Sequence, residues 1–173
     1  VAQACTGLAR AHDAGVVHRD IKPANLFLAR RVDEVVVKLL DFGVARVKEG
    51  STSIESRLTQ TGVMLGTPLY MSPEQVMGAK NVDHRTDLWS LGVVLYEALS
   101  GTTPHAEVET LGALIVSICS KPGRALQDVA PHIRDSTAAI VHKALEIDPA
   151  KRYASAEAML HDLKQLLPRG VGL

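Results

Sequence analysis

The sequence predicts a mainly helical α+β domain with one small β-hairpin near its N-terminal end. Apolar residues recur at helical spacing through most of the stretch from residue 86 to residue 167. Two short apolar runs, Leu26–Leu28 and Val35–Leu40, flank a charged stretch and have the pattern of paired strands. The 173 residues are 46% hydrophobic and 22% charged, which is ordinary globular composition and enough chain to bury one core.

The first residues have the apolar spacing of a helix, and we expect the sequence to begin inside that helix. Its apolar side chains continue to Ala11, and Gly15 is well placed to end it. No capping Ser, Thr, Asp or Asn precedes it, and neither an initiator Met nor a signal-peptide pattern is present. We therefore expect these residues to be a piece of a longer protein. The apolar positions are Val1, Ala4, Cys5, Leu8 and Ala11.

A polar loop precedes the predicted hairpin and a long irregular stretch follows it. Residues 18–25 contain Pro23, which disfavours a helix there. From Gly43 to Pro73 no period is sustained, and Ser, Thr and Gly are frequent. Structureless stretches of this length are uncommon in compact domains and usually have a functional role.

The remaining sequence is predicted to be helical. Residues 88–99 are apolar all round the helix, which predicts a helix buried on every side, with Thr86 as its N-cap. A later helix is predicted to be capped by Ser155. The amphipathic helices lie at 111–118, 140–145 and 159–167.

Charge and cysteine content exclude several classes of protein. Nineteen Lys and Arg balance nineteen Asp and Glu, which argues against a partner held mainly by charge, such as nucleic acid or an acidic membrane. Cys5 and Cys119 lack a CxxC partner, so we expect no disulfide framework or zinc site and a reducing, cytoplasmic compartment. No apolar run approaches the length of a membrane span.

Polar residues on the two sides of the hairpin are candidates for a metal and phosphate site. Asp20, Lys22 and Asn25 lie on the loop before the first strand, and Asp41 follows the second. Carboxylate and amide oxygens suit a hard divalent cation such as Mg²⁺, and an ammonium suits a phosphate. Gly43 permits a sharp turn directly after Asp41 and Phe42. A hairpin would bring Asp41 close to Asn25.

At these residues the sequence resembles the protein kinases. The resemblance covers essentially the whole chain, with the motifs in the family's order. It implies a partial kinase domain over residues 1–173, with the catalytic loop at 18–25, the activation segment at 41–74 and the C-terminal helices at 86–167. The glycine-rich loop, strand lysine and partner glutamate of kinases have no match here, so it implies a C-terminal lobe without its N-terminal lobe. The matching motifs are His18-Arg19-Asp20 with Asn25, Asp41-Phe42-Gly43, Gly66–Glu74, Asp87–Gly92 and Asp148–Arg152.

The resemblance implies a role for each polar residue of the site. Asp20 is the base that accepts the proton of the substrate hydroxyl, and Lys22 neutralises charge on the transferred phosphoryl group. Asn25 and Asp41 hold Mg²⁺, or Mn²⁺ in its place, with ATP as the phosphoryl donor. Each residue also has a plainer alternative role. Asp20 could be a loop carboxylate that accepts from nearby backbone N–H groups, Lys22 a solvated lysine, and Asn25 and Asp41 ordinary turn residues.

Other residues are implied to support the site. His18 and Phe42 pack against each other, and Phe27 lies under the adenine of ATP. The alternative for Phe27 is an ordinary position in the hydrophobic core. Asp87 anchors the catalytic-loop backbone from the head of a buried helix. Glu74 pairs with Arg152, and the default for Trp89 is core. Ser72 replaces the alanine usual in the family, a change expected to be harmless; the other six histidines are assigned to surface or packing.

The combination of Lys22 and Thr67 resembles the pattern of the serine/threonine branch of the family. The residues around the motifs resemble those of its bacterial members. Thr59 and Thr61 are the predicted activating phosphosites, with Arg19 as receptor for the phosphate. The alternative for both threonines is a solvated loop position.

The implied function is ATP-dependent phosphoryl transfer to serine or threonine hydroxyls of protein substrates, with this chain alone inactive. A non-catalytic pseudokinase or scaffold module is the alternative, and a truncated, inactive gene product is a third. The implied partners are protein substrates and the missing N-terminal lobe, with no nucleic acid and no membrane contact from this segment. A membrane anchor elsewhere in the parent protein remains compatible with the resemblance.

Overall fold

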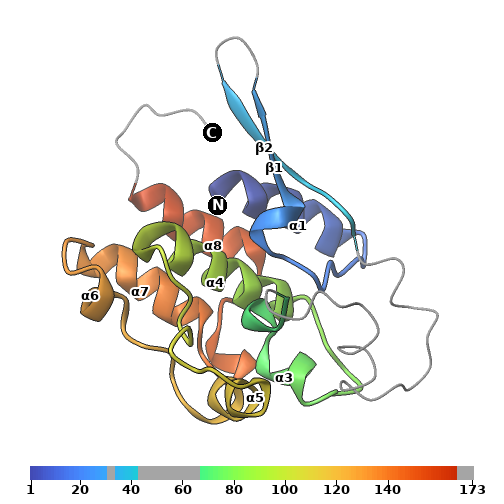
Figure 1. Cartoon of the computed structure of the whole chain (residues 1–173). Coiled ribbons are helices and arrows are strands. Elements are labelled where there is room, and N and C mark those ends of the chain that lie inside the picture. The colour runs from blue at the N-terminus through green and yellow to red at the C-terminus, as the bar shows by residue number, and fades with distance from the viewer. Residues whose placement is uncertain (31–33, 43–66, 167–173) are drawn as a thin grey trace.

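A two-stranded hairpin stands on one end of a body of packed helices (Figure 1). The computed structural model describes residues 1–30, 34–42 and 67–166. The mainly helical fold with one hairpin is the predicted arrangement. The helices are α1 (Ala2–Asp13), α3 (Pro73–Val76), α4 (Arg85–Ser100), α5 (Leu111–Ser120), α6 (Leu126–Val129), α7 (Asp135–Ala144) and α8 (Ala156–Gln165), and the strands are β1 (Leu26–Arg30) and β2 (Val35–Leu39). Short 3-10 turns lie at Pro23–Asn25, Thr67–Tyr70 and Pro149–Lys151.

The side chain of Gln3 connects the hairpin to α1. It makes hydrogen bonds to the backbone of β2 of the kind that a neighbouring strand would make. β1 and β2 are antiparallel, with Leu26 opposite Leu39. The amide oxygen of Gln3 accepts from the Val37 N–H at 2.7 Å, and its nitrogen donates to the Val35 carbonyl at 3.2 Å. These bonds occupy backbone groups on the outer edge of β2, which would otherwise need another partner.

Helix α4 runs through the centre of the helical body (Figure 1). Every residue from 86 to 96 is buried, which confirms the predicted all-round burial over the first three turns and the core position of Trp89. Gly92 allows α7 to approach closely, because a Cβ built on it would lie 2.8 Å from the Cβ of Ala144. Such a contact is closer than packed carbon atoms tolerate, so the two helices need glycine here.

The predicted N-cap of α4 is wrong. The helix begins at Arg85 after His84, whose side chain makes no cap hydrogen bond. Thr86 lies inside the first turn, where its hydroxyl is 2.6 Å from the hydroxyl of Ser72. A residue 14 positions away has therefore taken the hydroxyl that local reasoning assigned to the helix terminus.

Two helix termini agree with the sequence-based prediction, the start of α8 and the end of α1. Ser155 caps α8 by accepting from the Ala158 N–H at 3.2 Å. Gly15, with φ of 73°, follows the end of α1. Helix α1 packs against α8 and against β2, which closes the body on the side of the hairpin. The short helices α3 and α6 and the turn at Pro23–Asn25 are too brief to produce a period and were not predicted.

The hairpin presents apolar side chains to solvent. Phe27 is 53% exposed and Leu28 is 61% exposed, so the alternative that Phe27 is plain core is wrong. We call the exposed apolar residues of this region the hairpin surface. It consists of Phe27, Leu28, Val35 and Leu40. Successive side chains of a strand point to opposite faces, so Phe27 lies on one face of the hairpin and Leu28 and Val35 lie on the other. Both faces therefore present apolar side chains to solvent.

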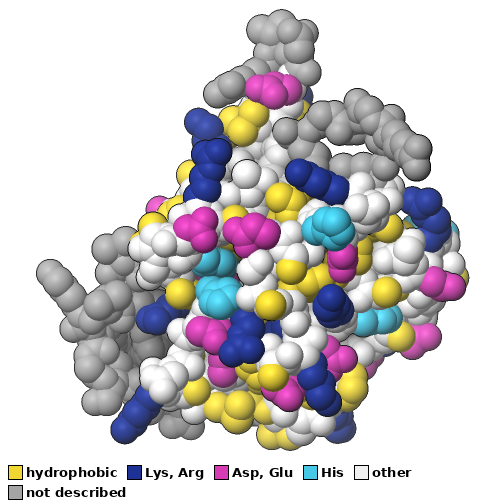
Figure 2. Space-filling view, turned by 180° about the vertical axis from the view of Figure 1, so that it is seen from behind, with side chains coloured by type: hydrophobic (Ala, Val, Ile, Leu, Met, Phe, Trp, Pro, Cys, Tyr) yellow, Lys and Arg dark blue, Asp and Glu magenta, His cyan; other side chains and the backbone are white. Residues whose placement is uncertain are grey.

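The remaining surface mixes charges of both signs. On the face seen in Figure 2, basic and acidic side chains are interspersed rather than segregated. Within the three described ranges, no helix is both long and apolar enough to cross a membrane. Both cysteines are free thiols, and burial raises the pKa of Cys5 to about 12, so that thiol stays protonated and unreactive at neutral pH.

Candidate active site

The loop between α1 and β1 brings three of the predicted site residues together. The Lys22 Nζ lies 3.1 Å from the Asp20 Oδ2, and the Asn25 Nδ2 donates to the same oxygen at 3.1 Å. Asn25 also donates to the backbone carbonyl of Asp20 at 2.8 Å. The carboxylate of Asp20 is therefore oriented by an ammonium and an amide, and about three-quarters of the side chain is buried, since it is 23% exposed.

The hairpin returns the chain to this loop at Asp41. The Leu40 N–H donates to the Asn25 carbonyl at 2.9 Å, directly beyond the Leu26–Leu39 pair. Asp41, the next residue, has φ of 54°, a left-handed conformation that turns the chain away from the strand. The predicted proximity of the Asp41 and Asn25 segments thus follows from the pairing of β1 with β2.

His18 connects the start of the loop between α1 and β1 to the residues that follow β2. Its ring centroid lies 4.7 Å from that of Phe42, which confirms the predicted packing. The Asp20 N–H donates to His18 Nδ1 at 3.3 Å, so this nitrogen is the acceptor. The Nε2, which lies 2.8 Å from the Leu40 carbonyl, is then the protonated nitrogen and donates to it. His18 therefore acts through packing and hydrogen bonds.

Asp87 holds the backbone of the loop from within the helical body. Its two carboxylate oxygens accept from the N–H groups of His18 at 2.9 Å and Arg19 at 2.7 Å, as expected for an anchor. The side chain is fully buried in the first turn of α4, where the helix dipole favours a negative charge. His12, near the end of α1, places its Nε2 2.8 Å from the same carboxylate. The contribution of His12 was not predicted, because 75 residues separate it from Asp87.

Arg19 occupies a strained backbone conformation next to Asp20. Its φ of 65° lies in the left-handed region, which costs a non-glycine residue about 1–3 kcal/mol. Its N–H is held by Asp87, and its carbonyl accepts from Gln75 Nε2 at 2.8 Å. The contact with Gln75 was also missed, because nothing in the local pattern of residues 72–76 points to residue 19.

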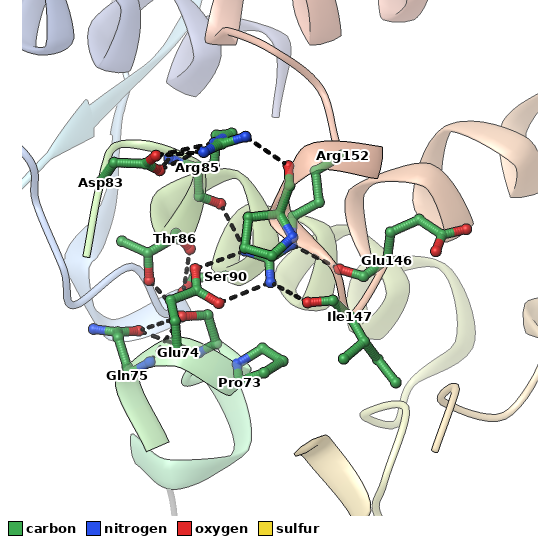
Figure 3. Close-up of polar contacts among 12 residues, drawn as sticks. Pro73, Glu74, Gln75, Asp83, Arg85, Thr86, Ser90, Glu146, Ile147 and Arg152 are labelled. Carbon is green, nitrogen blue, oxygen red and sulfur yellow. Dashed lines mark hydrogen bonds and ion pairs between the residues drawn. The ribbon is translucent and has the colours of Figure 1, made fainter. Parts of the chain in front are cut away.

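Glu74 and Arg152 form the predicted ion pair, with bidentate geometry (Figure 3). The two guanidinium nitrogens donate to the two carboxylate oxygens at 2.8 Å each. Arg152 also donates to three backbone carbonyls and lies 4.9 Å from the centre of the Trp89 ring. The acceptors are the carbonyls of Glu146 at 2.7 Å, Ile147 at 3.0 Å and Arg85 at 3.2 Å. This network connects α3, α4 and the turn before α8.

The residues before α3 are held against α4. The Ser90 hydroxyl donates to the Tyr70 carbonyl at 2.7 Å, and the Tyr70 hydroxyl donates to Glu97 at 2.7 Å. Burial, followed by this bond to Glu97, raises the pKa of Tyr70, so the phenol stays protonated as donor. Ser72 is fully buried and caps α3, and this role agrees with the expectation that serine at this position is harmless.

Several predicted positions lie outside the part of the chain that the structure describes. Gly43, Thr59 and Thr61 lie outside the described residues, so their assigned roles stay predictions. The backbone of Thr67 begins a 3-10 turn, but its side chain is likewise outside the described part. Arg19, the predicted phosphate receptor, donates through one guanidinium nitrogen to the Val82 carbonyl at 3.4 Å.

The donor set at the loop is compatible with a hard divalent cation. The nitrogen of Asn25 makes both bonds to Asp20, which leaves its amide oxygen as the atom that could face a cation. Asp41 is exposed and contributes a carboxylate from the neighbouring strand end. Among residues 1–30, 34–42 and 67–166, no group of three or more His, Cys, Asp or Glu side chains could hold a metal.

Comparison with known proteins gives the class to which this fold and loop belong. A family model described as the protein kinase domain matches residues 1–163. The chain therefore belongs to the protein kinase family.

Its relatives place it with the bacterial serine/threonine kinases. It is 40% identical over 167 residues to the serine/threonine-protein kinase pkn3 of Myxococcus xanthus, covering 95% of this chain and 30% of that protein. It is 38% identical over 172 residues to Pkn1 of the same organism, covering 99% of this chain and 24% of that one. PknB of Mycobacterium leprae is 40% identical over 169 residues, covering 94% and 25%. The chain thus spans less than a third of each of these relatives.

Proposed function

We propose that this chain is the C-terminal lobe of an ATP- and Mg²⁺-dependent serine/threonine protein kinase. The observation that carries the proposal is the convergence of Lys22 and Asn25 on the carboxylate of Asp20, on a loop whose backbone Asp87 holds. By the resemblance of the motifs, these are the residues to which kinases assign phosphoryl transfer. Family membership supports the same assignment.

In this mechanism Asp20 orients the hydroxyl of the protein substrate and accepts its proton. Lys22 supplies a positive charge beside that carboxylate, where charge on the transferred phosphoryl group is neutralised. Asn25 and Asp41 would hold Mg²⁺, which supplies further charge neutralisation when it is bound with ATP. The contribution of the chain is positioning, since the bonds from Asn25, His18 and Asp87 fix the loop before substrate arrives.

A pseudokinase that binds partners without catalysis is the second candidate function. It would use the same fold, and the hairpin surface would serve as its binding face. The presence of Asp20, Lys22, Asn25 and Asp41 favours the enzyme, because a module that only binds has no need of a base and a cation site together.

The proposal is tested by joining residues 1–173 to a kinase N-terminal lobe that carries a glycine-rich loop and a strand lysine. We call this protein the complete domain. With γ-labelled ATP, Mg²⁺ and a generic basic protein, we expect label on serine and threonine, whereas residues 1–173 alone should give background counts, because half of the nucleotide site is missing. Robust turnover by residues 1–173 alone, label mainly on tyrosine, or an inactive complete domain would each contradict the proposal.

The hairpin surface should also make the chain prone to association. If it normally meets the other lobe, residues 1–173 alone expose it, and exposed apolar patches promote aggregation. Size-exclusion chromatography with light scattering should show oligomers for residues 1–173 and fewer for a Phe27→Ser/Leu28→Ser variant. The matched control is Ala79→Ser/Ala98→Ser, on exposed positions away from the hairpin. A monodisperse monomer with a sharp thermal transition would count against this account.

A further inference from the structure

We propose that Gln75 is a positioning residue for the catalytic loop. Its side chain connects the peptide group between Arg19 and Asp20 to α3. The inference rests on the proposed function and adds a residue that the motifs of the loop do not include. It follows from one direct contact, between Gln75 Nε2 and the Arg19 carbonyl at 2.8 Å.

The carbonyl of Arg19 and the N–H of Asp20 belong to one planar peptide group. A hydrogen bond to the carbonyl therefore limits rotation of that whole group. The N–H side of the same peptide donates to His18 Nδ1 at 3.3 Å, so both sides are held. Because Arg19 has φ of 65°, relaxation toward ordinary backbone angles would turn this peptide and move Asp20 away from Lys22.

Gln75 is itself fixed by the cap of α3. Its amide oxygen accepts from the Ser72 N–H at 3.2 Å, and its backbone N–H donates to the Ser72 hydroxyl at 3.4 Å, which together form a capping box. With the oxygen used by Ser72, the amide nitrogen is left to donate to Arg19, so the side-chain orientation follows from the hydrogen-bond network. Figure 3 shows Gln75 beside Glu74 in the short helix that faces Thr86.

The hydrogen-bond network of Gln75 and Ser72 also includes residues of the first turn of α4. The hydroxyl of Ser72 lies 2.6 Å from that of Thr86, and both residues are fully buried. The next residue of α4, Asp87, accepts from the Arg19 N–H at 2.7 Å. One turn of a buried helix thus holds the N–H of Arg19 directly and its carbonyl through Ser72 and Gln75.

This arrangement links the base to the segment that ends at α3. Ser72 follows the turn Thr67–Tyr70 with only Met71 between them, so a displacement of the chain at Ser72 would remove the donor from the Arg19 carbonyl. The strained peptide would then lose the hydrogen bond from Gln75 to its carbonyl. We infer that correct placement of residues 67–75 is required for correct placement of Asp20.

Gln75→Glu in the complete domain separates positioning from capping. Glutamate can still accept from the Ser72 N–H at this position of a capping box, but its carboxylate cannot donate to Arg19. We expect kcat to fall about 5- to 20-fold, since an internal hydrogen bond is lost and an oxygen then faces an oxygen. The KM for ATP and the melting temperature should stay near those of the unmodified domain. Hydrogen exchange should accelerate in residues 18–22 and remain unchanged in 73–77.

Gln127→Glu is the matched control. Gln127 lies on α6 and donates to Asp135 at 3.2 Å, so the same replacement removes a side-chain hydrogen bond far from the loop. It should leave kcat and the exchange of residues 18–22 unchanged. Unaltered kcat in Gln75→Glu, or faster exchange confined to 73–77, would overturn the inference. If the unmodified domain transfers no phosphate, the proposed function fails, and exchange in residues 18–22 still decides whether Gln75 holds the loop.

Discussion

Asp20→Asn is expected to lower kcat of the complete domain at least about 100-fold, the usual contribution of a general base. Asparagine has the shape of aspartate but cannot take the proton of the substrate hydroxyl. It also removes the charge that pairs with Lys22 at 3.1 Å and replaces one acceptor of the Asn25 amide. The measurement is steady-state phosphoryl transfer at saturating ATP and Mg²⁺.

Asp41→Asn should cause a loss of similar size for a different reason. It weakens the site for Mg²⁺, so activity should recover partly as the Mg²⁺ concentration rises, whereas that of Asp20→Asn should not. Asp128→Asn, on the exposed side of α6, is the control and should leave the rate unchanged. If both Asp20→Asn and Asp41→Asn kept nearly normal rates, the assignment of the site would be wrong.

Arg152→Ala is expected to lower the free energy of unfolding by about 3–5 kcal/mol. The side chains of both partners are largely buried, since that of Arg152 is 0% exposed and that of Glu74 is 12% exposed. Removing the guanidinium leaves the Glu74 carboxylate without its counter-charge inside the protein. It also leaves the carbonyls of Glu146, Ile147 and Arg85 without this donor. Denaturant unfolding of the complete domain measures the loss.

Arg124→Ala is the matched control for that variant. Arg124 and Glu107 are 3.8 Å apart with side chains 48% and 67% exposed, and an ion pair in solvent is worth about 0–1 kcal/mol. A loss in Arg152→Ala no larger than that in Arg124→Ala would show that the buried pair does not stabilise the fold.

The elements that reasoning from sequence predicted well are those with a local signal. The hairpin follows from two apolar runs, and α4 follows from apolar residues distributed all round the helix. The predicted contacts of Asp20 with its neighbours, of Asp87 with the loop and of Glu74 with Arg152 depended on motifs of fixed spacing. For such motifs the resemblance to kinases supplies the distant partner that periodicity cannot.

The missed contacts join residues that are distant in sequence and lie in no such motif. Gln75 bonds to Arg19 across 56 positions, and His12 reaches Asp87 across 75. Thr86 has the residue type of an N-cap, but its hydroxyl is used by Ser72 after the chain has folded. Such tertiary use overrides local preference, and a single sequence contains no sign of it.

The most direct test of the central claim, that the loop and the end of the hairpin form one cation and nucleotide site, is paramagnetic broadening. In the complete domain with ATP and Mn²⁺ in place of Mg²⁺, we expect the amide signals of residues 20–25 and 41 to broaden, and those of α5 to remain sharp. Asp41→Ala should abolish the broadening in residues 20–25. Broadening centred elsewhere, or broadening of residues 20–25 that survives Asp41→Ala, would contradict the account.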